Sequence, residues 1–259
     1  MSALPHRKSD SFNLTETLLY GLAVAAAFVG IRTLLIQPFN IPSESMLPTL
    51  LVGDHIIVSK FSYGFSRYSV PFAPFDFSGR LLASPPERGD VVVFRARIDD
   101  EEKDLIKRIV GLPGDHIQML GGRLHINGQP VRREQAPDFI GEGACRSEGA
   151  APDARTRRWR ETLPNGVAYE TLDCMDGTPL DDTPVMTVPP ERYFIMGDNR
   201  DESFDSRVPE PEGFGGVPFE NLIGRAQVVY LSVQDGERVW MIWRWPWSMR
   251  WPRLFTVVR

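Results

Sequence analysis

The chain has 259 residues, enough for one or two domains with a sizeable apolar core. Its formal net charge of −5 argues against a nucleic-acid partner, because a protein that binds nucleic acid normally carries a basic surface. Only four of the 29 basic residues are lysines, so a lysine within an apolar strand stands out in this chain.

An apolar segment at residues 18–36 carries one charge, Arg32, close to its C-terminal end. As a helix it spans about 28 Å, near the roughly 30 Å hydrocarbon core of a bilayer, and Arg32 can extend to the headgroups. A cleaved signal peptide is the alternative, but the small residues Ala23-Val24-Ala25 lie inside the apolar segment and not after it. We predict an uncleaved anchor at 17–36 after a tail at 1–16.

Basic residues near the anchor predict its orientation. Arg7 and Lys8 precede it, and the next basic residue after Arg32 is Lys60. Because cytoplasmic flanks are enriched in lysine and arginine, the tail is expected in the cytoplasm and the body on the far side.

The two cysteines fit an exported body. Cys145 and Cys174 lack C-x-x-C spacing, and a cysteine pair outside the cytoplasm can form a disulfide. We expect a bridge, with two unpaired structural cysteines as the alternative.

After the anchor, the patterns of β-branched and apolar residues between Gly and Pro predict strands and few helices. The mostly β body is expected to form a folded-over sheet or an open barrel. Residues 127–187 are more polar and predict a smaller cap domain inserted into a main β domain made of 37–126 and 188–259. The predicted strands are 55–58, 91–94, 105–110, the hairpin 116–120 with 123–126, 188–196 and 222–233.

Five of the six tryptophans lie between Trp240 and Trp251, interleaved with Arg244 and Arg250. Tryptophan and arginine together suit the headgroup layer of a membrane. A packed aromatic terminus is the alternative.

Two serines, Ser43 and Ser45, stand in a loop between Pro42 and Pro48. Proline fixes φ near −65°, so this short loop is stiff. A hydroxyl held rigidly before a strand can be a nucleophile, and the alternative is a turn serine that bonds its own backbone.

Lys107 lies within the predicted strand 105–110, where alternation places it on one face with Leu105 and Ile109. Burial among aliphatic side chains lowers the pKa of an amine, and a neutral lysine can act as the general base for a serine. The alternative is a solvated lysine at a sheet edge.

Residues 197–207 follow a predicted strand and combine charges and hydroxyls densely. Asp205 and Arg207 can form an ion pair, and Ser203 can orient a nearby amine. A calcium loop is the alternative, but the segment lacks the glycine and the closing glutamate of an EF-hand. We expect no metal and no cofactor.

These stretches together resemble, in the same order, the sequence boxes of bacterial type I signal peptidases (leader peptidases), a family of peptidases with a Ser-Lys dyad. The similarity runs from the anchor to about Val233. The matching stretches are PSESMLPTL at 42–50, RGDVVVF at 88–94, IKR at 106–108 with GLPGD at 111–115, and GDNRD at 197–201 with DSR at 205–207.

The resemblance implies a membrane-bound serine endopeptidase that removes N-terminal signal peptides from exported preproteins after small residues, in an Ala-x-Ala pattern. It implies Ser45 as the nucleophile and Lys107 as the general base. The hydroxyl of Ser43 and the main-chain N–H of Ser45 would form the oxyanion hole.

Supporting roles also follow from the resemblance. Ser203 would hold the amine of Lys107, and Asp205 with Arg207 would brace the loop that carries it. Shallow apolar pockets for small side chains would be lined by Phe39, Ile41, Met46, Leu50, Ile56, Val93, Leu105 and Ile106.

The family's fold is a largely antiparallel β catalytic body with a smaller inserted β-rich domain, which agrees with the predicted cap at 127–187. The resemblance places the chain in the bacterial inner membrane as a single-pass protein, with its catalytic domain on the periplasmic side. Its expected partners are preprotein signal peptides, membrane lipid and, in proximity, the protein-export translocon.

Four residues depart from the family's pattern. Glu44 stands where glycine is common, Glu202 stands where asparagine is common, and Val208-Pro209 replaces an aromatic–glycine pair. A specialised maturation peptidase of the conjugation or pilus type, a self-cleaving repressor protease and a catalytically idle membrane-tethered scaffold are the alternative functions. The anchor argues against the repressor, which is cytosolic.

Overall fold

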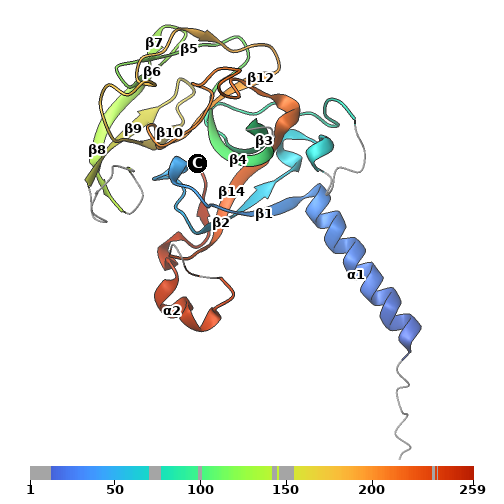
Figure 1. Cartoon of the computed structure of the whole chain (residues 1–259). Helices are drawn as coiled ribbons and strands as arrows, with labels where there is room; N and C mark the ends of the chain where they lie inside the picture. Colours follow the sequence, from blue (N-terminus) through green and yellow to red (C-terminus); the bar gives the residue numbers. More distant parts are fainter. Residues whose placement is uncertain are drawn as a thin grey trace, which may run out of the picture.

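The computed structural model describes residues 13–69, 77–98, 101–141, 145, 155–234, 237 and 239–259. It begins with helix α1 (Leu14–Leu34), which projects away from the β body in Figure 1. The stretch Leu14–Arg32 is apolar and not buried in the protein, so by length and composition it can cross a membrane. The helix ends earlier than the predicted boundary at 36, because Ile36 already begins a strand.

Eight strands form the large sheet of the body, in the order β1-β2-β14-β3-β4-β12-β13, with β15 paired to β14. All of these pairs are antiparallel, which confirms the predicted class of fold. The strands are β1 (Ile36–Asn40), β2 (Asp54–Ser59), β3 (Val91–Ile98), β4 (Glu101–Gly111), β12 (Arg192–Met196), β13 (Val217–Pro218), β14 (Leu222–Ser232) and β15 (Thr256–Val257).

Strand β14 lies near the middle of this sheet and bends. Its register shifts once against β3 and twice against β2, and such irregularities bend a strand and increase its twist. At Gly224 a Cβ would collide with the main-chain oxygen of Ser59, so glycine is required for this close approach of two strands.

Two smaller sheets form the rest of the β structure, in the orders β11-β5-β6-β7 and β10-β9-β8. The predicted hairpin is present, and its turn residues Gly121 and Gly122 both have positive φ, of 52° and 70°. Their strands are β5 (His116–Leu120), β6 (Arg123–Ile126), β7 (Gln129–Pro130), β8 (Arg132–Ile140), β9 (Arg155–Thr162), β10 (Ala168–Asp173) and β11 (Met186–Thr187).

The hairpin belongs to a small sheet and not to the large one, because β5 pairs with β11. The second sheet system therefore begins at His116, earlier than the start of the predicted cap at 127. One apolar cluster joins this region to the main body, with Val110 and Met196 from the large sheet packed beside Ile117 and Leu124 from the hairpin.

The predicted strands are all present, with small differences in their ends. The stretch predicted at 188–196 is a strand only from Arg192, since Pro189 and Pro190 cannot donate to a ladder. Short 3₁₀ helices connect the strands: η1 (Glu44–Met46), η2 (Phe61–Tyr63), η3 (Arg67–Ser69) and η4 (Phe219–Asn221).

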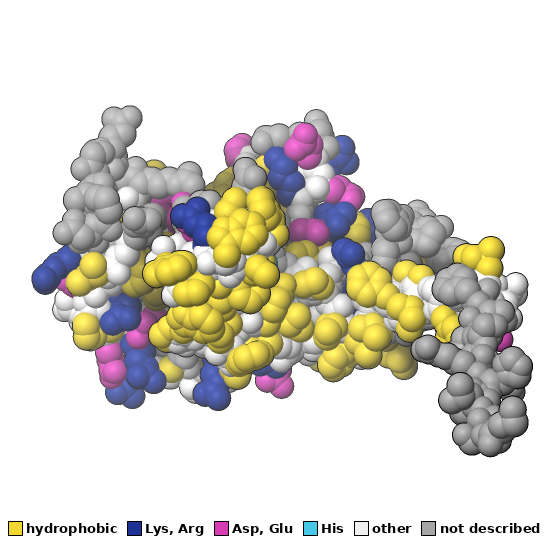
Figure 2. Space-filling model, turned by 90° about the horizontal axis from the view of Figure 1, so that it is seen from below, with side chains coloured by type: hydrophobic (Ala, Val, Ile, Leu, Met, Phe, Trp, Pro, Cys, Tyr) yellow, Lys and Arg dark blue, Asp and Glu magenta, His cyan; other side chains and the backbone are white. Residues whose placement is uncertain are grey.

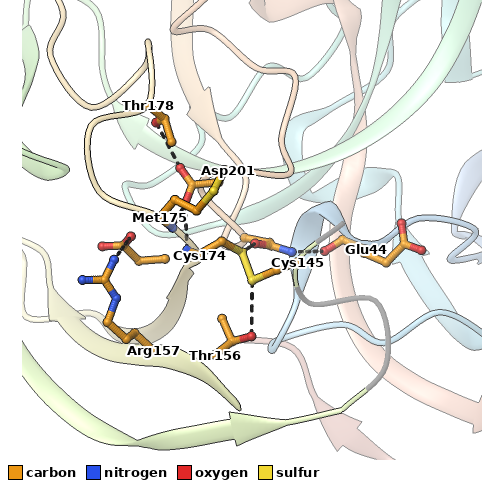
Figure 3. The surroundings of a disulfide bond; sticks show 10 residues. Glu44, Cys145, Thr156, Arg157, Cys174, Met175, Thr178 and Asp201 are labelled. Carbon is orange, nitrogen blue, oxygen red and sulfur yellow. Dashed lines mark hydrogen bonds and ion pairs between the residues drawn. A yellow bond between two sulfur atoms is a disulfide. The ribbon is translucent and has the colours of Figure 1, made fainter. Parts of the chain in front are cut away.

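The predicted disulfide between Cys145 and Cys174 is confirmed. It ties the segment after β8 to the end of β10. The bridge lies beside the loop that follows β12, and Figure 3 shows this neighbourhood.

The tryptophan-rich tail folds into η5 (Ile242–Arg244), helix α2 (Trp245–Ser248) and η6 (Trp251–Arg253). Four of its tryptophans are exposed, and Trp247 is 77% exposed. Seen from below, where α2 lies in Figure 1, the molecule presents a broad gathering of apolar side chains (Figure 2). Trp245 packs against the buried cluster of Leu231, Val233 and Met249, so one of the five tryptophans anchors the tail while the other four remain exposed.

Candidate active site

The loop between β1 and β2 carries Ser43 and Ser45 and is held at both ends. At its start, Ile41 donates its N–H to the carbonyl of Asp54 (2.8 Å), and at its end Leu51 donates to a carboxylate oxygen of the same Asp54 (2.8 Å). Between them, Met46 is fully buried in the core cluster beneath the loop. The main chain at Ser45 is thus fixed by local bonds and packing.

Ser45 and Lys107 are in direct contact although 62 residues separate them. Lys107 Nζ donates hydrogen bonds to Ser45 Oγ (2.6 Å) and to the carbonyl of Ile106 (3.1 Å). Both residues are nearly buried, with 7% of Ser45 and 4% of Lys107 exposed. Ser43 Oγ lies 3.4 Å from Ser45 Oγ, so the hydroxyl that contacts the amine has a second hydroxyl beside it.

Burial lowers the pKa of Lys107 to about 8, against an ordinary value of 10.5. Desolvation penalises the charged amine most strongly, and the nearby carboxylates of Asp205 and Asp198 offset only part of that penalty. A substantial fraction of Lys107 is therefore neutral near pH 8, in the state that can accept a proton.

Asp205 and Arg207 form the predicted ion pair, with Arg207 Nε 2.8 Å from Asp205 Oδ1. Both side chains are buried. Burial raises the pKa of Asp205, but the charge of Arg207 and the N–H of Gly197, which donates to Asp205 Oδ2 (3.0 Å), outweigh it and hold that pKa below its usual range. The pair fixes the start and the end of the loop 197–207 against each other.

The loop also packs directly against the serine segment at Gly197. A Cβ on Gly197 would collide with Ser203 Oγ and lie 2.6 Å from the carbonyl oxygen of Ser45. Ser203 is buried beside it. Its hydroxyl helps to hold the pKa of Asp205 down, while the amine of Lys107 donates to Ser45 and to Ile106. A contact between Ser203 and Lys107 stays a prediction.

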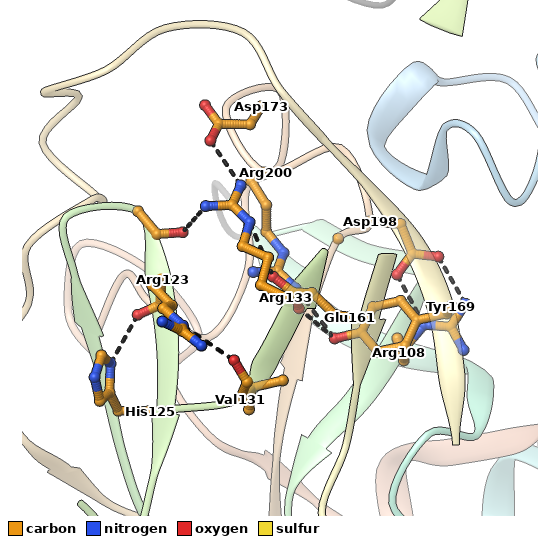
Figure 4. Close-up of polar contacts among 12 residues, drawn as sticks. Arg108, Arg123, His125, Val131, Arg133, Glu161, Tyr169, Asp173, Asp198 and Arg200 are labelled. Atoms are coloured by element: carbon orange, nitrogen blue, oxygen red, sulfur yellow. Dashed lines mark hydrogen bonds and ion pairs between the residues drawn. The ribbon is translucent and has the colours of Figure 1, made fainter. Parts of the chain in front are cut away.

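A buried ion pair next to Lys107 was missed from the sequence. Arg108 donates to Asp198 through Nε (2.8 Å) and Nη2 (2.7 Å), and its guanidinium stacks over the ring of Tyr169 at 4.2 Å (Figure 4). Tyr169 in turn donates to Glu161 (2.9 Å), which also pairs with Arg200 (2.5 Å). This network connects the large sheet, the loop after β12 and the small β10-β9-β8 sheet.

The residues predicted to line substrate pockets fall mainly into one apolar cluster beneath the serine loop. Ile41, Met46, Leu50, Ile56, Val93 and Ile106 are buried members of it, and Phe39 packs against its edge. Leu105 packs instead against a second cluster. Most of these side chains are thus core residues in this structure, and partly exposed Phe39 lies at the margin.

No group of three or more His, Cys, Asp or Glu side chains suited to a metal ion occurs within the part of the chain that the structure describes. The three aspartates of the loop 197–207 are engaged elsewhere. Asp198 pairs with Arg108, Asp205 pairs with Arg207, and Asp201 accepts from the main chain near Cys174.

A serine hydroxyl bonded to a buried lysine amine on a rigid β scaffold is an arrangement used by serine peptidases with a lysine base. The sequence agrees with this class. Residues 14–231 match the model of the family described as signal peptidase, peptidase S26, and the chain belongs to this family of bacterial type I signal peptidases.

Signal peptidases I from three Rickettsia species are among the similar proteins. The chain is 40% identical to that of Rickettsia prowazekii over 238 residues, covering 87% of this chain and 84% of the relative. It is 40% identical to that of Rickettsia typhi and 42% identical to that of Rickettsia canadensis, each over 212 residues that cover 79% of this chain and 75% of the relative. The resemblance stated from the sequence boxes is therefore confirmed, and the protein is a serine peptidase of the signal peptidase type.

Proposed function

We propose that this protein cleaves signal peptides from exported preproteins with Ser45 as the nucleophile and neutral Lys107 as the general base. The observation that carries the proposal is the 2.6 Å contact between Ser45 Oγ and Lys107 Nζ in a nearly buried site. When the amine is neutral, this hydrogen bond runs from the hydroxyl to the nitrogen, and the serine is ready to lose its proton.

Acylation then proceeds in balanced steps. Ser45 Oγ attacks the carbonyl carbon of the scissile bond while Lys107 takes the hydroxyl proton. The tetrahedral intermediate collapses when the resulting ammonium of Lys107 returns that proton to the leaving amine, which releases the mature protein. Lys107 next removes a proton from water as the water oxygen attacks the carbonyl carbon of the acyl-enzyme. The second intermediate collapses when the ammonium of Lys107 returns this proton to Ser45 Oγ, which breaks the ester bond and releases the signal peptide as a carboxylic acid.

Charge on the carbonyl oxygen must be stabilised during attack. The N–H of Ser45 and the hydroxyl of Ser43 are the proposed donors, and the 3.4 Å distance between the two serine oxygens supports their convergence on one substrate carbonyl. Each such donor contributes about 3 kcal/mol to the transition state.

Supporting residues hold this geometry in place. Asp205 with Arg207 is proposed to fix the loop behind the dyad, as their buried ion pair supports. Ser203 is proposed to orient the amine of Lys107 during the reaction. In the present conformation that amine donates to the carbonyl of Ile106, so this role requires the amine to exchange partners.

Specificity for small residues in an Ala-x-Ala pattern is proposed to come from the apolar cluster beneath the serine loop. Its members are already packed in the core, which leaves only shallow space for a substrate side chain. Phe39, at the partly exposed margin of the cluster, is the first candidate for contact with substrate.

The membrane is the proposed setting of the reaction. Ser45 is nine residues beyond Ile36, so it lies no more than about 30 Å from the end of the apolar segment, at the surface where a signal peptide emerges. The exposed tryptophans of the tail, with Trp247 77% exposed, are proposed to rest in the headgroup layer of the same leaflet (Figure 2).

This placement implies a single-pass protein of the bacterial inner membrane. The catalytic domain would lie on the periplasmic side, beside the export translocon. The division into a catalytic domain of 37–126 and 188–259 with a cap at 127–187 also remains a proposal.

The direct test uses the purified full chain in detergent with one preprotein, followed by N-terminal sequencing of the product. We expect a new N-terminus immediately after an Ala-x-Ala sequence. Ser45→Ala should abolish cleavage in a protein that a thermal melt shows to be folded, because the change removes only the hydroxyl of a small side chain. Cleavage by a well-folded Ser45→Ala variant would disprove the assignment of the nucleophile.

A further inference from the structure

The disulfide lies against the two loops that build the candidate active site. Leu172, two residues before Cys174, exchanges main-chain hydrogen bonds with the loop after β12: its N–H donates to Asp198 (2.9 Å) and its carbonyl accepts from Arg200 (3.0 Å). The end of β10 therefore runs alongside this loop, and the bridge closes immediately after it (Figure 3).

Asp201 is the point at which the bridged segment holds that loop. Its Oδ2 accepts from the N–H of Cys174 (2.7 Å) and of Met175 (3.1 Å), and its Oδ1 accepts from the hydroxyl of Thr178 (3.2 Å). Three donors on one short segment converge on one carboxylate. Hydrogen bonds to a charged acceptor are stronger than neutral ones.

The same loop supports the main chain of the proposed nucleophile. The N–H of Asn199 donates to the carbonyl of Ser45 (3.1 Å), and Asn199 Nδ2 donates to the carbonyl of Glu44 (3.3 Å). Asn199 is two residues before Asp201 in the same loop. A shift of Asp201 would therefore be transmitted to the main chain of Ser45 through one hydrogen bond and to that of Glu44 through the other.

Packing provides a second connection between the disulfide and the serine loop. Leu47 and Leu172 form a small buried cluster, and Cys145 and Leu51 pack against it. Leu47 is two residues after Ser45. The bridge is thus linked to the serine loop by apolar contact as well as through Asp201.

We propose that the Cys145–Cys174 disulfide and Asp201 form a clamp that positions Ser45 for attack, so that turnover depends on the bridge. Neither the disulfide nor Asp201 touches the reacting atoms, so Cys145, Cys174 and Asp201 are positioning residues. This proposal rests on the proposed role of Ser45 as the nucleophile.

The expected effect is on turnover and not on substrate binding. Displacement of a reacting group by about 1 Å can cost about 10²-fold in rate. Because the local bonds that anchor the serine loop to Asp54 remain, we expect a loss of about tenfold in kcat when the clamp is released. KM should change little, since the cluster proposed to bind substrate is separate from the cluster at the bridge.

The test compares variants that remove the clamp with matched controls. Asp201→Ala removes all three accepted bonds, whereas Asp201→Asn keeps an oxygen that can accept from Cys174 and Met175. Asp176→Ala is the matched control, because Asp176 is on the same segment, its side chain is 84% exposed, and its carboxylate pairs with Arg157 and accepts none of the three hydrogen bonds made to Asp201. The bridge itself is removed in a Cys145→Ser/Cys174→Ser double variant.

Each full-length protein is assayed in detergent with a preprotein, with and without dithiothreitol, at a temperature at which its thermal melt shows it to be folded. We expect kcat to fall about tenfold in Asp201→Ala and in the double variant, to recover in Asp201→Asn and to stay normal in Asp176→Ala. Dithiothreitol should lower kcat of the wild type and leave the double variant unchanged.

Two results would overturn the clamp. One is a kcat equal to that of the wild type in both the folded Asp201→Ala variant and the folded double-cysteine variant. The other is a loss confined to melting temperature, which would make the bridge purely structural. If Ser45→Ala is inactive in the same assay while Asp201→Ala is normal, the clamp fails and the proposed function stands. Cleavage by Ser45→Ala would instead refute the proposed nucleophile.

Discussion

The pH dependence of catalysis depends most directly on Lys107. Replacing Lys107 by arginine preserves the positive charge and much of the length, and replacing it by alanine removes both. Both variants should be inactive, because a guanidinium stays protonated at any working pH and cannot accept the proton of Ser45. A structural role for the charge alone would instead leave Lys107→Arg active.

The magnitude follows from the buried environment of the amine. At its ordinary pKa of 10.5, a lysine would be neutral in only about 0.3% of molecules at pH 8. Burial lowers the pKa of Lys107 to about 8, so about half of the molecules are competent at that pH. Desolvation thus increases the active fraction about 150-fold at pH 8.

The charged neighbours of Lys107 predict which substitutions shift the pH profile of the cleavage rate. The negative charge of Asp205 raises the pKa of Lys107, and the positive charge of Arg207 lowers it by repelling the ammonium. Arg207→Met should leave the charge of Asp205 free to stabilise the ammonium, and the profile should shift to higher pH. Arg207→Lys keeps the charge and serves as the control.

The assay is kcat/KM for cleavage of one preprotein between pH 6 and 10, on variants shown by thermal melts to be folded. Activity requires the neutral amine, so the rate should rise about tenfold per pH unit below 8 and level off above it. A profile that rises only near pH 10, or cleavage by Lys107→Arg, would show that another group is the base.

Three further outcomes are expected. Ser43→Ala should lower kcat by ~10²–10³ with little change in KM, and an unchanged kcat would remove Ser43 from the oxyanion hole. Gly197→Ala should reduce both melting temperature and activity, because its Cβ collides with Ser203; normal values for both would contradict the packing described. Residues 37–259 without the helix should still sediment with anionic liposomes, and Trp243→Ser/Trp247→Ser should weaken this binding; a protein that ignores liposomes would make the exposed tryptophans irrelevant to lipid.

Local patterns in the sequence were sufficient to predict most of the fold. The apolar run predicted α1, and the β-branched runs at 91–94 and 105–110 predicted β3 and β4, because strands buried in a sheet need apolar side chains. Strand β1 was missed because it follows the anchor directly and contains Pro38, which weakens a strand pattern. The hairpin was predicted but its pairing with β11 was not, since alternation identifies strands and not the partners they pair with.

The sequence also predicted the central residues of the candidate site, but not all of their partners. The stiffness of the serine loop and the apolar neighbours of Lys107 pointed to these residues, and the structure brings them within hydrogen-bond distance. The partnership of Arg108 with Asp198 was not predicted, because 90 residues separate them and nothing local marks the pair. The one available signal was an arginine in an apolar strand, which needs a buried acid as its partner.

Two adjacent cations on β4 meet opposite electrostatic environments. Arg108 is fully buried, yet its pKa is raised because Asp198 more than offsets its desolvation through two hydrogen bonds. Lys107 is also buried, but desolvation outweighs the attraction of Asp205 and Asp198, to which the charge of Arg207 is opposed, and so the pKa of Lys107 falls. Arg108 thus keeps a permanent charge, and its ion pair joins the large sheet to the neighbouring loop. Lys107, the next residue in the chain, is an amine whose charged form is disfavoured. Asp205 and Asp198 both raise the pKa of Lys107, so a carboxylate freed from its arginine would stabilise the ammonium and withdraw the amine from its neutral, proton-accepting state.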